Sequence, residues 1–152
     1  MNTRETNKTI LVTGGAGFVG SNLAKRLLRD GNRVIAVDNL ITGKKQNIEP
    51  LIENGRFLFV ESCITESTFL TNMREHTIDE IFHIACPTGV PNIARLGEEM
   101  LLTCSLGTLN VLTLAREQNA RILFTSTAEV YGNPQVSPQC ESYTGNVDPI
   151  GP

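Results

Sequence analysis

The sequence of 152 residues contains no tryptophan, and none of its apolar runs approaches the roughly 20 residues that a membrane-spanning helix needs. It also lacks a cluster of basic residues, and its net charge of −3 argues against binding to nucleic acid or to an anionic membrane. The segment from Met1 to Lys8 is polar, without the apolar stretch of a secretory signal. We therefore expect a cytoplasmic protein with small-molecule partners.

Cysteine is present, but not in the spacing of a metal site. Cys63, Cys86, Cys104 and Cys140 form no C-x-x-C pair, so neither a zinc site nor a redox dithiol is indicated. We predict no bound metal. The four residues are expected to be free thiols that serve as small apolar core residues.

Short β-branched apolar runs alternate with longer amphipathic segments, a pattern typical of a parallel sheet with crossover helices. Strands are expected at residues 9–12, 33–37, 57–60, 79–85 and 121–126, and helices at 17–29, 47–54, 68–76 and 92–119. The last helix is expected to turn inward the apolar residues Leu106, Leu109, Val111, Leu112 and Leu114.

The order of these elements predicts the α/β class, as a doubly wound parallel sheet of the Rossmann type. Residues 1–152 are expected to form one partial domain, incomplete because it lacks the C-terminal strands and the substrate-binding part of such a fold. Residues from about 132 to 152 are rich in proline and glycine and predict a loop.

A glycine-rich turn lies between the first expected strand and the first expected helix. Gly14, Gly17 and Gly20 have the spacing of a dinucleotide-binding turn, in which glycines allow the tight turn, the approach of a pyrophosphate and close helix packing. Asp38 ends the second strand, at the position where a carboxylate accepts hydrogen bonds from a ribose. The sequence therefore predicts a nicotinamide dinucleotide as cofactor.

The charge near this turn bears on which dinucleotide is bound. The carboxylate of Asp38 would repel the 2′-phosphate of NADP, which favours NAD. Lys44 and Lys45 provide the alternative, because their ammonium groups are able to contact such a phosphate. NADP therefore remains the alternative to NAD as cofactor. A further alternative is that the turn is a plain loop that binds no ligand.

The sequence resembles the extended short-chain dehydrogenase/reductases, and within them the NAD-dependent epimerase/dehydratase family of nucleotide sugars. The similar stretches are ILVTGGAGFVGSNL, VIAVDNLITGKKQNIE, IFHIACP, LGTLNVLTLA and RILFTSTAEVYGNPQVSPQCESYTGNVDPIGP. The last stretch is most similar to the branch that decarboxylates UDP-glucuronate. The resemblance implies bound NAD, oxidation of the sugar to a 4-keto intermediate, loss of CO₂ and formation of UDP-xylose.

The resemblance also implies roles for individual residues. The cofactor would be held by Gly14, Gly17, Phe18, Val19, Gly20, Asp38, Asn39, Ile41, Thr42, Ile84, Cys86 and Thr103. Asn110 would contact the substrate. Thr127 would hydrogen-bond the reacting sugar oxygen, and Glu129 would relay a proton as a second catalytic group. The simpler interpretations are a threonine at a strand end and a solvated glutamate. His83 is expected to be packed rather than catalytic.

The sequence departs from the family at several positions. The resemblance places the family's catalytic Tyr-x-x-x-Lys pair shortly after Pro152, where the given sequence ends. Tyr131 and Tyr143 do not replace it, because Gln135 and Val147 stand at the lysine position. A nearby lysine would lower the pKa of such a tyrosine. Departures that remove a polar or charged group are Cys63, Leu102, Cys104 and Ala128.

These departures leave three functions open. The first is a decarboxylase or epimerase of nucleotide sugars that is active only together with the missing Tyr, Lys and substrate region. The second is a truncated or non-catalytic NAD-binding pseudoenzyme that pairs with an intact homologue or with itself. The third is an NAD-dependent oxidoreductase that acts on another substrate. Uncovered apolar surface on an incomplete sheet leads us to expect oligomerisation or aggregation.

Overall fold

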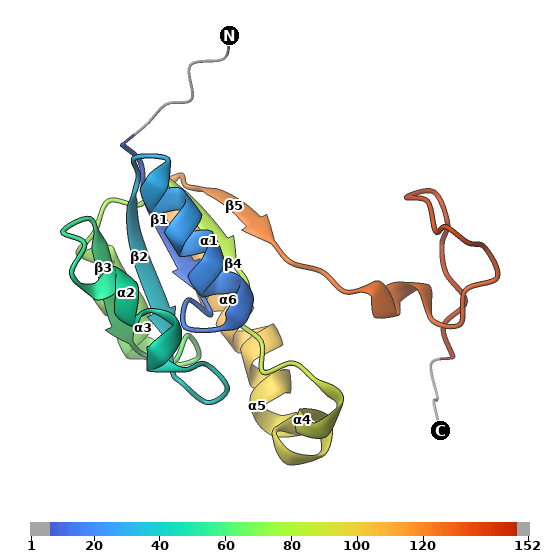
Figure 1. The fold of residues 1–152 in the computed structure, drawn as a ribbon. Helices are drawn as coiled ribbons and strands as arrows, with labels where there is room; N and C mark the ends of the chain where they lie inside the picture. Colours follow the sequence, from blue (N-terminus) through green and yellow to red (C-terminus); the bar gives the residue numbers. More distant parts are fainter. Residues whose placement is uncertain (1–6, 149–152) are drawn as a thin grey trace, which may run out of the picture.

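A five-stranded parallel sheet forms the centre of the computed structural model, which describes residues 7–148 except for the side chain of Val90 (Figure 1). The strands are β1 (Thr9–Thr13), β2 (Arg33–Asp38), β3 (Phe57–Glu61), β4 (Glu80–His83) and β5 (Arg121–Phe124). Their order is β3-β2-β1-β4-β5, and all neighbours are parallel. The order in which successive strands are added thus reverses between β1 and β4. Doubly wound sheets bind their ligands at such a point, beside the carboxyl ends of the strands.

Helices cover both faces of the sheet. On one face, α1 (Phe18–Arg29) and α2 (Glu49–Ile52) pack against Ile10, Val12 and Val34. On the other face, α3 (Ser67–Arg74) and α6 (Thr108–Gln118) pack against Leu11 and other buried strand residues. Successive residues of β1 therefore point into different cores, and this explains why the central strands are apolar throughout. The predicted doubly wound fold is confirmed.

The segment predicted as one helix over residues 92–119 is divided in the structure. It consists of α4 (Val90–Arg95), α5 (Gly97–Leu102), the π-helical turn η2 (Thr103–Gly107) and α6. The helix is interrupted between α4 and α5 at Leu96, which has φ −129° and ψ 30°. A π-helical turn holds more residues than an α-helical turn, so it rotates the apolar face that the sequence pattern projects.

The predicted inward face of this segment is therefore wrong at three positions. Leu106, Leu109 and Leu112 are exposed, whereas Val111 and Leu114 are buried against α3 and the sheet. If residues 92–119 formed one regular helix, their apolar residues would be expected on one continuous stripe along it. Within α6, Val111 and Leu114 lie on the face toward the core, whereas Leu109 and Leu112 lie on other faces of the same helix, so apolar character alone did not identify the inward face.

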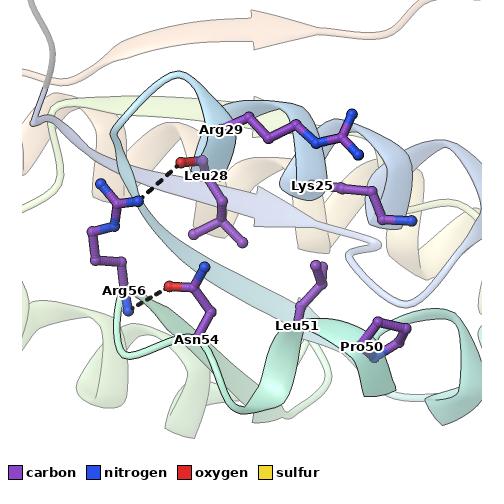
Figure 2. Close-up of a pocket in the computed structure, with 7 residues that line it drawn as sticks. All are labelled: Lys25, Leu28, Arg29, Pro50, Leu51, Asn54 and Arg56. Atoms are coloured by element: carbon purple, nitrogen blue, oxygen red, sulfur yellow. Dashed lines mark hydrogen bonds between the residues drawn. The ribbon is translucent and has the colours of Figure 1, made fainter.

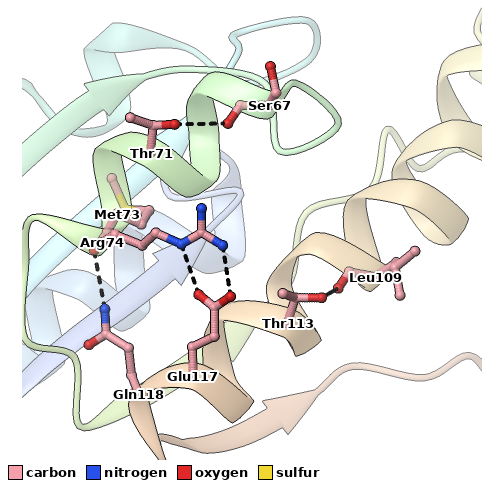
Figure 3. Close-up of polar contacts among 8 residues, drawn as sticks. All are labelled: Ser67, Thr71, Met73, Arg74, Leu109, Thr113, Glu117 and Gln118. Atoms are coloured by element: carbon pink, nitrogen blue, oxygen red, sulfur yellow. Dashed lines mark hydrogen bonds and ion pairs between the residues drawn. The ribbon is translucent and has the colours of Figure 1, made fainter.

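Polar contacts join α3 and α6 at the surface above their apolar contact (Figure 3). Arg74 donates two hydrogen bonds to Glu117, at 2.9 and 2.7 Å, and this contact lowers the pKa of Glu117. Gln118 donates to the carbonyl oxygens of Met73 and His76 and accepts from the backbone N–H of Ile78. Exposed ion pairs contribute little to stability, so the buried apolar side chains below hold the two helices together.

The chain after β5 runs away from the sheet (Figure 1). It forms the short turn η3 (Ala128–Tyr131) and then a loop without further strands or helices as far as residue 148. Asn146 closes this loop, since its N–H donates to Tyr131 O and its carbonyl oxygen accepts from Asn133 N–H. Residues 132–148 contain no regular helix or strand, and residues 149–152 of the predicted loop lie outside the described part.

Two smaller expectations also have outcomes. Over residues 7–148, no helix combines the length and the apolar character needed to cross a bilayer. The four cysteines are free as expected, but they are not core residues: Cys63 and Cys86 are half-buried, and Cys104 and Cys140 are exposed. Spacing along a sequence shows whether cysteines suit a metal, but it does not show on which side of an element each one lies.

Candidate functional site

The glycine turn joins β1 to α1 at the carboxyl end of β1. Gly14 has φ +71°, a conformation that favours glycine, and a Cβ there would lie 3.0 Å from Ala85 Cα. A Cβ on Gly20 would overlap Gly14 O, so only glycine permits this approach of helix and turn. The sequence motif did not single out Gly15, although a Cβ on Gly15 would overlap the side chain of Ala36.

Gly17 is less crowded than these glycines, although an added side chain would still be tight there. A Cβ there would meet only Gly14 O, at 3.2 Å. Gly17 is the N-cap of α1, and no described side chain caps this helix end. The first N–H groups of a helix have no partner within the helix and attract anions. The side chains of Phe18 and Val19 next to them are 82% and 58% exposed.

Asp38 lies beside this turn, as the sequence predicts. Its Oδ2 accepts a hydrogen bond from Ala16 N–H at 3.0 Å, and its Oδ1 accepts one from Leu40 N–H at 2.8 Å. Gly43 approaches the same carboxylate so closely that a Cβ would lie 2.7 Å from Oδ1. Backbone contacts thus hold the carboxylate in one orientation between the glycine turn and the loop after β2.

The loop after β2 brings together further predicted residues. Asn39 accepts a hydrogen bond from Ile41 N–H, and its amide donates to Cys63 Sγ at 3.6 Å. Ile41 and Thr42 are exposed on the same loop. Lys45, by contrast, forms an ion pair with Glu61 at 2.8 Å. Cys63 therefore lies next to the predicted cofactor residues, where the resemblance places an aspartate.

A buried polar network connects the ends of β1 and β4, and sequence reasoning missed its central residue, Thr13. Thr13 Oγ1 accepts from the N–H groups of Ile84 and Ala85, both at 3.2 Å, and lies 2.7 Å from His83 Nδ1. With its lone pairs used, the hydroxyl donates to Nδ1, so His83 carries its proton on Nε2 and donates to Thr108 Oγ1 at 3.0 Å. The only signal was a threonine ending the strand before the turn.

His83 is packed, as predicted, and not exposed to a ligand. Its side chain is buried and its ring lies 5.4 Å from that of Phe124. Burial lowers the pKa of His83, which keeps the imidazole neutral. The network fixes Ile84, a predicted cofactor residue, against the end of β1.

Three further predicted residues lie after β4 and in the helical segment formed by η2 and α6. Cys86 Sγ lies 3.3 Å from Cys104 Sγ, and the neighbouring Thr103 is buried in η2. Asn110 is held by a hydrogen bond from its amide to Ile64 O at 2.8 Å. The structure thus brings Cys86 next to η2 and joins Asn110 to the loop after β3.

The two predicted catalytic residues lie beyond β5. Thr125 continues the pairing with β4, because both its N–H and its hydroxyl donate to His83 O. Thr127 and Glu129 follow on η3, both exposed, and Thr127 Oγ1 accepts from Glu129 N–H at 3.2 Å. Among the described residues, no hydrogen bond joins Thr127 or Glu129 to the glycine turn. Thr127 therefore caps a short turn that lies away from the sheet (Figure 1).

A separate cavity of about 340 Å³ lies between α1 and α2 (Figure 2). Its lining residues are Lys25, Leu28, Arg29, Pro50, Leu51, Asn54 and Arg56. Arg56 leads into β3 and donates to Gly31 O and Leu28 O. The cavity is therefore near the amino end of β3, and none of the predicted site residues lines it.

The model of the GDP-mannose 4,6 dehydratase family matches residues 11–152. The chain belongs to this family. UDP-glucuronic acid decarboxylase 1 of Xenopus tropicalis is 45% identical over 145 residues, which cover 95% of this chain and 33% of that protein. The resemblance to the epimerase/dehydratases that the sequence stretches indicated is thereby confirmed.

Two solved structures of this kind show the same fold. An epimerase of Methanothermobacter thermautotrophicus has a TM-score of 0.83 and 34% identity, over 91% of this chain and 41% of that one. UDP-glucose-4-epimerase of Stenotrophomonas maltophila, solved with NAD and formylated UDP-arabinopyranose, has a TM-score of 0.80 and 27% identity, over 92% and 43%. The chain thus spans between a third and half of the length of these relatives.

Proposed function

We propose that this chain binds NAD at the carboxyl end of the sheet, against the glycine turn and the loops after β2 and β4. The observation that carries the proposal is the start of α1 at Gly17, which no described side chain caps, next to the fixed carboxylate of Asp38. The pyrophosphate would meet the first N–H groups of α1, and the adenosine ribose would meet Asp38. The NAD complex of the Stenotrophomonas epimerase, which has the same fold, supports this assignment.

Other residues would hold the two ends of the cofactor. Asn39, Ile41 and Thr42 form the adenosine side on the loop after β2, while Ile84, Cys86 and Thr103 form the nicotinamide side. Phe18 and Val19 would cover the pyrophosphate with side chains that are otherwise exposed. The pairing of Lys45 with Glu61 supports NAD over NADP, because that ammonium group is already engaged.

We further propose that the site serves the modification of a nucleotide sugar, most like the decarboxylation of UDP-glucuronate to UDP-xylose. The 45% identity to a UDP-glucuronic acid decarboxylase supports this substrate class. When bound, NAD supplies an acceptor that takes a hydride from the sugar and later returns it. Thr127 would hydrogen-bond the reacting sugar oxygen, Glu129 would relay a proton, and Asn110 would help to position the substrate.

Calorimetric titration with NAD and NADP tests the cofactor assignment. We expect the chain to bind NAD more tightly than NADP, since Asp38 disfavours a 2′-phosphate. Asp38→Asn keeps an oxygen for one backbone N–H but removes the charge, so it should reduce the preference for NAD while the thermal unfolding transition is retained. Absence of binding heat with either dinucleotide, in a folded wild-type chain, would refute the assignment.

A second function, NAD binding without turnover, is proposed for residues 1–152 taken alone. Neither tyrosine has a lysine four residues later, and the two tyrosine rings stack on each other at 5.9 Å. We expect UDP-glucuronate and NAD to yield no CO₂ with the 152-residue chain. Steady CO₂ release would instead show that the Tyr-x-x-x-Lys pair is dispensable here.

A further inference from the structure

Two cysteines meet at the carboxyl edge of the sheet. Cys86 follows β4 and Cys104 lies in η2, and their Sγ atoms are 3.3 Å apart although 18 positions separate them in the sequence. Cys104 is exposed, whereas Cys86 is half-buried. The other two thiols have different neighbours: Cys63 Sγ lies 3.0 Å from Thr65 Oγ1, and Cys140 Sγ lies 3.2 Å from Ser142 Oγ.

We propose that Cys86 and Cys104 are a redox modification site, which forms a reversible intramolecular disulfide with a low-molecular-weight disulfide such as oxidised glutathione as the oxidant. A disulfide has an S–S distance of about 2.05 Å, so the two sulfur atoms need to approach by only about 1.2 Å. Cys104 lies on an exposed turn, where its side chain has room to move. This site goes beyond the proposed function, and its formation does not depend on NAD.

The surroundings of the two thiols determine the order of the steps. Burial, together with the hydrogen bond to Cys104, raises the pKa of Cys86 to about 11, which makes Cys86 the weaker nucleophile at neutral pH. The exposed Cys104 is therefore the first to react. Its thiolate attacks one sulfur of glutathione disulfide, the S–S bond of glutathione breaks, and one glutathione thiolate leaves.

The second step completes the exchange. Cys86 loses its proton to solvent, attacks Cys104 Sγ in the mixed disulfide and expels the second glutathione thiolate. The two protein thiols are oxidised, and one glutathione disulfide is reduced to two thiols. The new bond ties the segment that follows β4 to η2, beside Ala85, which packs against Gly14.

Peptide mapping tests the site directly, because trypsin separates the four cysteines. Cleavage after Arg56, Arg74, Arg95, Arg116 and Arg121 places Cys63 in residues 57–74, Cys86 in 75–95, Cys104 in 96–116 and Cys140 in 122–152. The chain is incubated in glutathione redox buffer, its free thiols are alkylated, and the digest is analysed by mass spectrometry without reduction. We expect peptides 75–95 and 96–116 to be linked, and dithiothreitol to release them.

Two controls distinguish folded geometry from general thiol reactivity. In urea the four cysteines should pair with only the modest preference that loop length gives to short separations. The folded chain should instead give at least about tenfold more of the Cys86–Cys104 link than of any other pair. Cys104→Ser should abolish the link and leave Cys86 largely unmodified, while Cys140→Ser should not change it. Accumulation of glutathione on Cys104 without the link, or the same mixture of pairs in folded and unfolded chain, would overturn the proposal.

Discussion

The first two strands, β1 and β2, and the last strand, β5, have similar apolar sequences but opposite surroundings. In β1 and β2, residues such as Leu11, Val12 and Ile35 are completely buried, because helices cover both faces. In β5, Leu123 and Phe124 are 50% and 54% exposed. An apolar strand therefore indicates a place in the sheet, but the cover that buries it is contributed by other parts of a fold.

The same difference divides the proposed site. The glycine turn and Asp38 belong to the packed region, where backbone contacts hold them in place. Thr127 and Glu129 belong to the open region after β5, where a single local hydrogen bond connects them. The cofactor side is thus preorganised within residues 7–148, while the catalytic side has only a local turn to fix it.

The largest effect that separates the two regions is expected from truncating a leucine in each. Leu11→Ala removes a fully buried side chain from the core beneath α3 and α6 and should lower the free energy of unfolding by about 2–5 kcal/mol. Leu123→Ala is the matched control, since the same atoms are removed from a half-exposed position. Urea unfolding of both variants measures the difference. Equal losses would mean that β5 is as well covered as β1.

The second prediction asks whether the packed region holds the cofactor. Gly17→Ala places a methyl group at the start of α1, where a pyrophosphate would approach, and 3.2 Å from Gly14 O. We expect NAD affinity to fall about tenfold, which is about 1.4 kcal/mol, while the chain stays folded with a thermal unfolding temperature lowered only by the tight contact with Gly14 O. Gly55→Ala is the control, because a Cβ there meets nothing within 4 Å. Equal affinity of both variants would place the pyrophosphate elsewhere.

The sequence predicted the packed region better than the open one, for physical reasons. The glycine spacing and Asp38 are local signals whose geometry follows from the strand and helix that flank them. The exposure of Leu109 depends on which face of α6 packs on the core, and the meeting of Cys86 with Cys104 depends on how η2 packs. Thr13 was missed because its role arises only where β1 and β4 become neighbours.

A smaller effect is expected from pH, through the network that joins the two regions at His83. Burial lowers the pKa of His83 in the folded chain, whereas the unfolded chain has the ordinary value of about 6.5. Below pH of about 6.5 the unfolded state therefore binds a proton that the folded state resists, and stability falls as pH decreases. His83→Gln should flatten this part of the urea-unfolding profile. An unchanged slope would show that other groups cause the acid dependence.

The smallest effect on stability is expected from Thr127→Ala in the open region. Loss of a helix cap typically costs about 1 kcal/mol, and the turn that Thr127 caps is short and exposed, so the cost should be no more than this. Because no packed element depends on the turn, urea unfolding should hardly change. A relative that contains the Tyr-x-x-x-Lys pair should instead lose turnover when its matching threonine is replaced. A large loss of stability in this chain would mean that η3 packs on the sheet, and the division between the two regions would then fail.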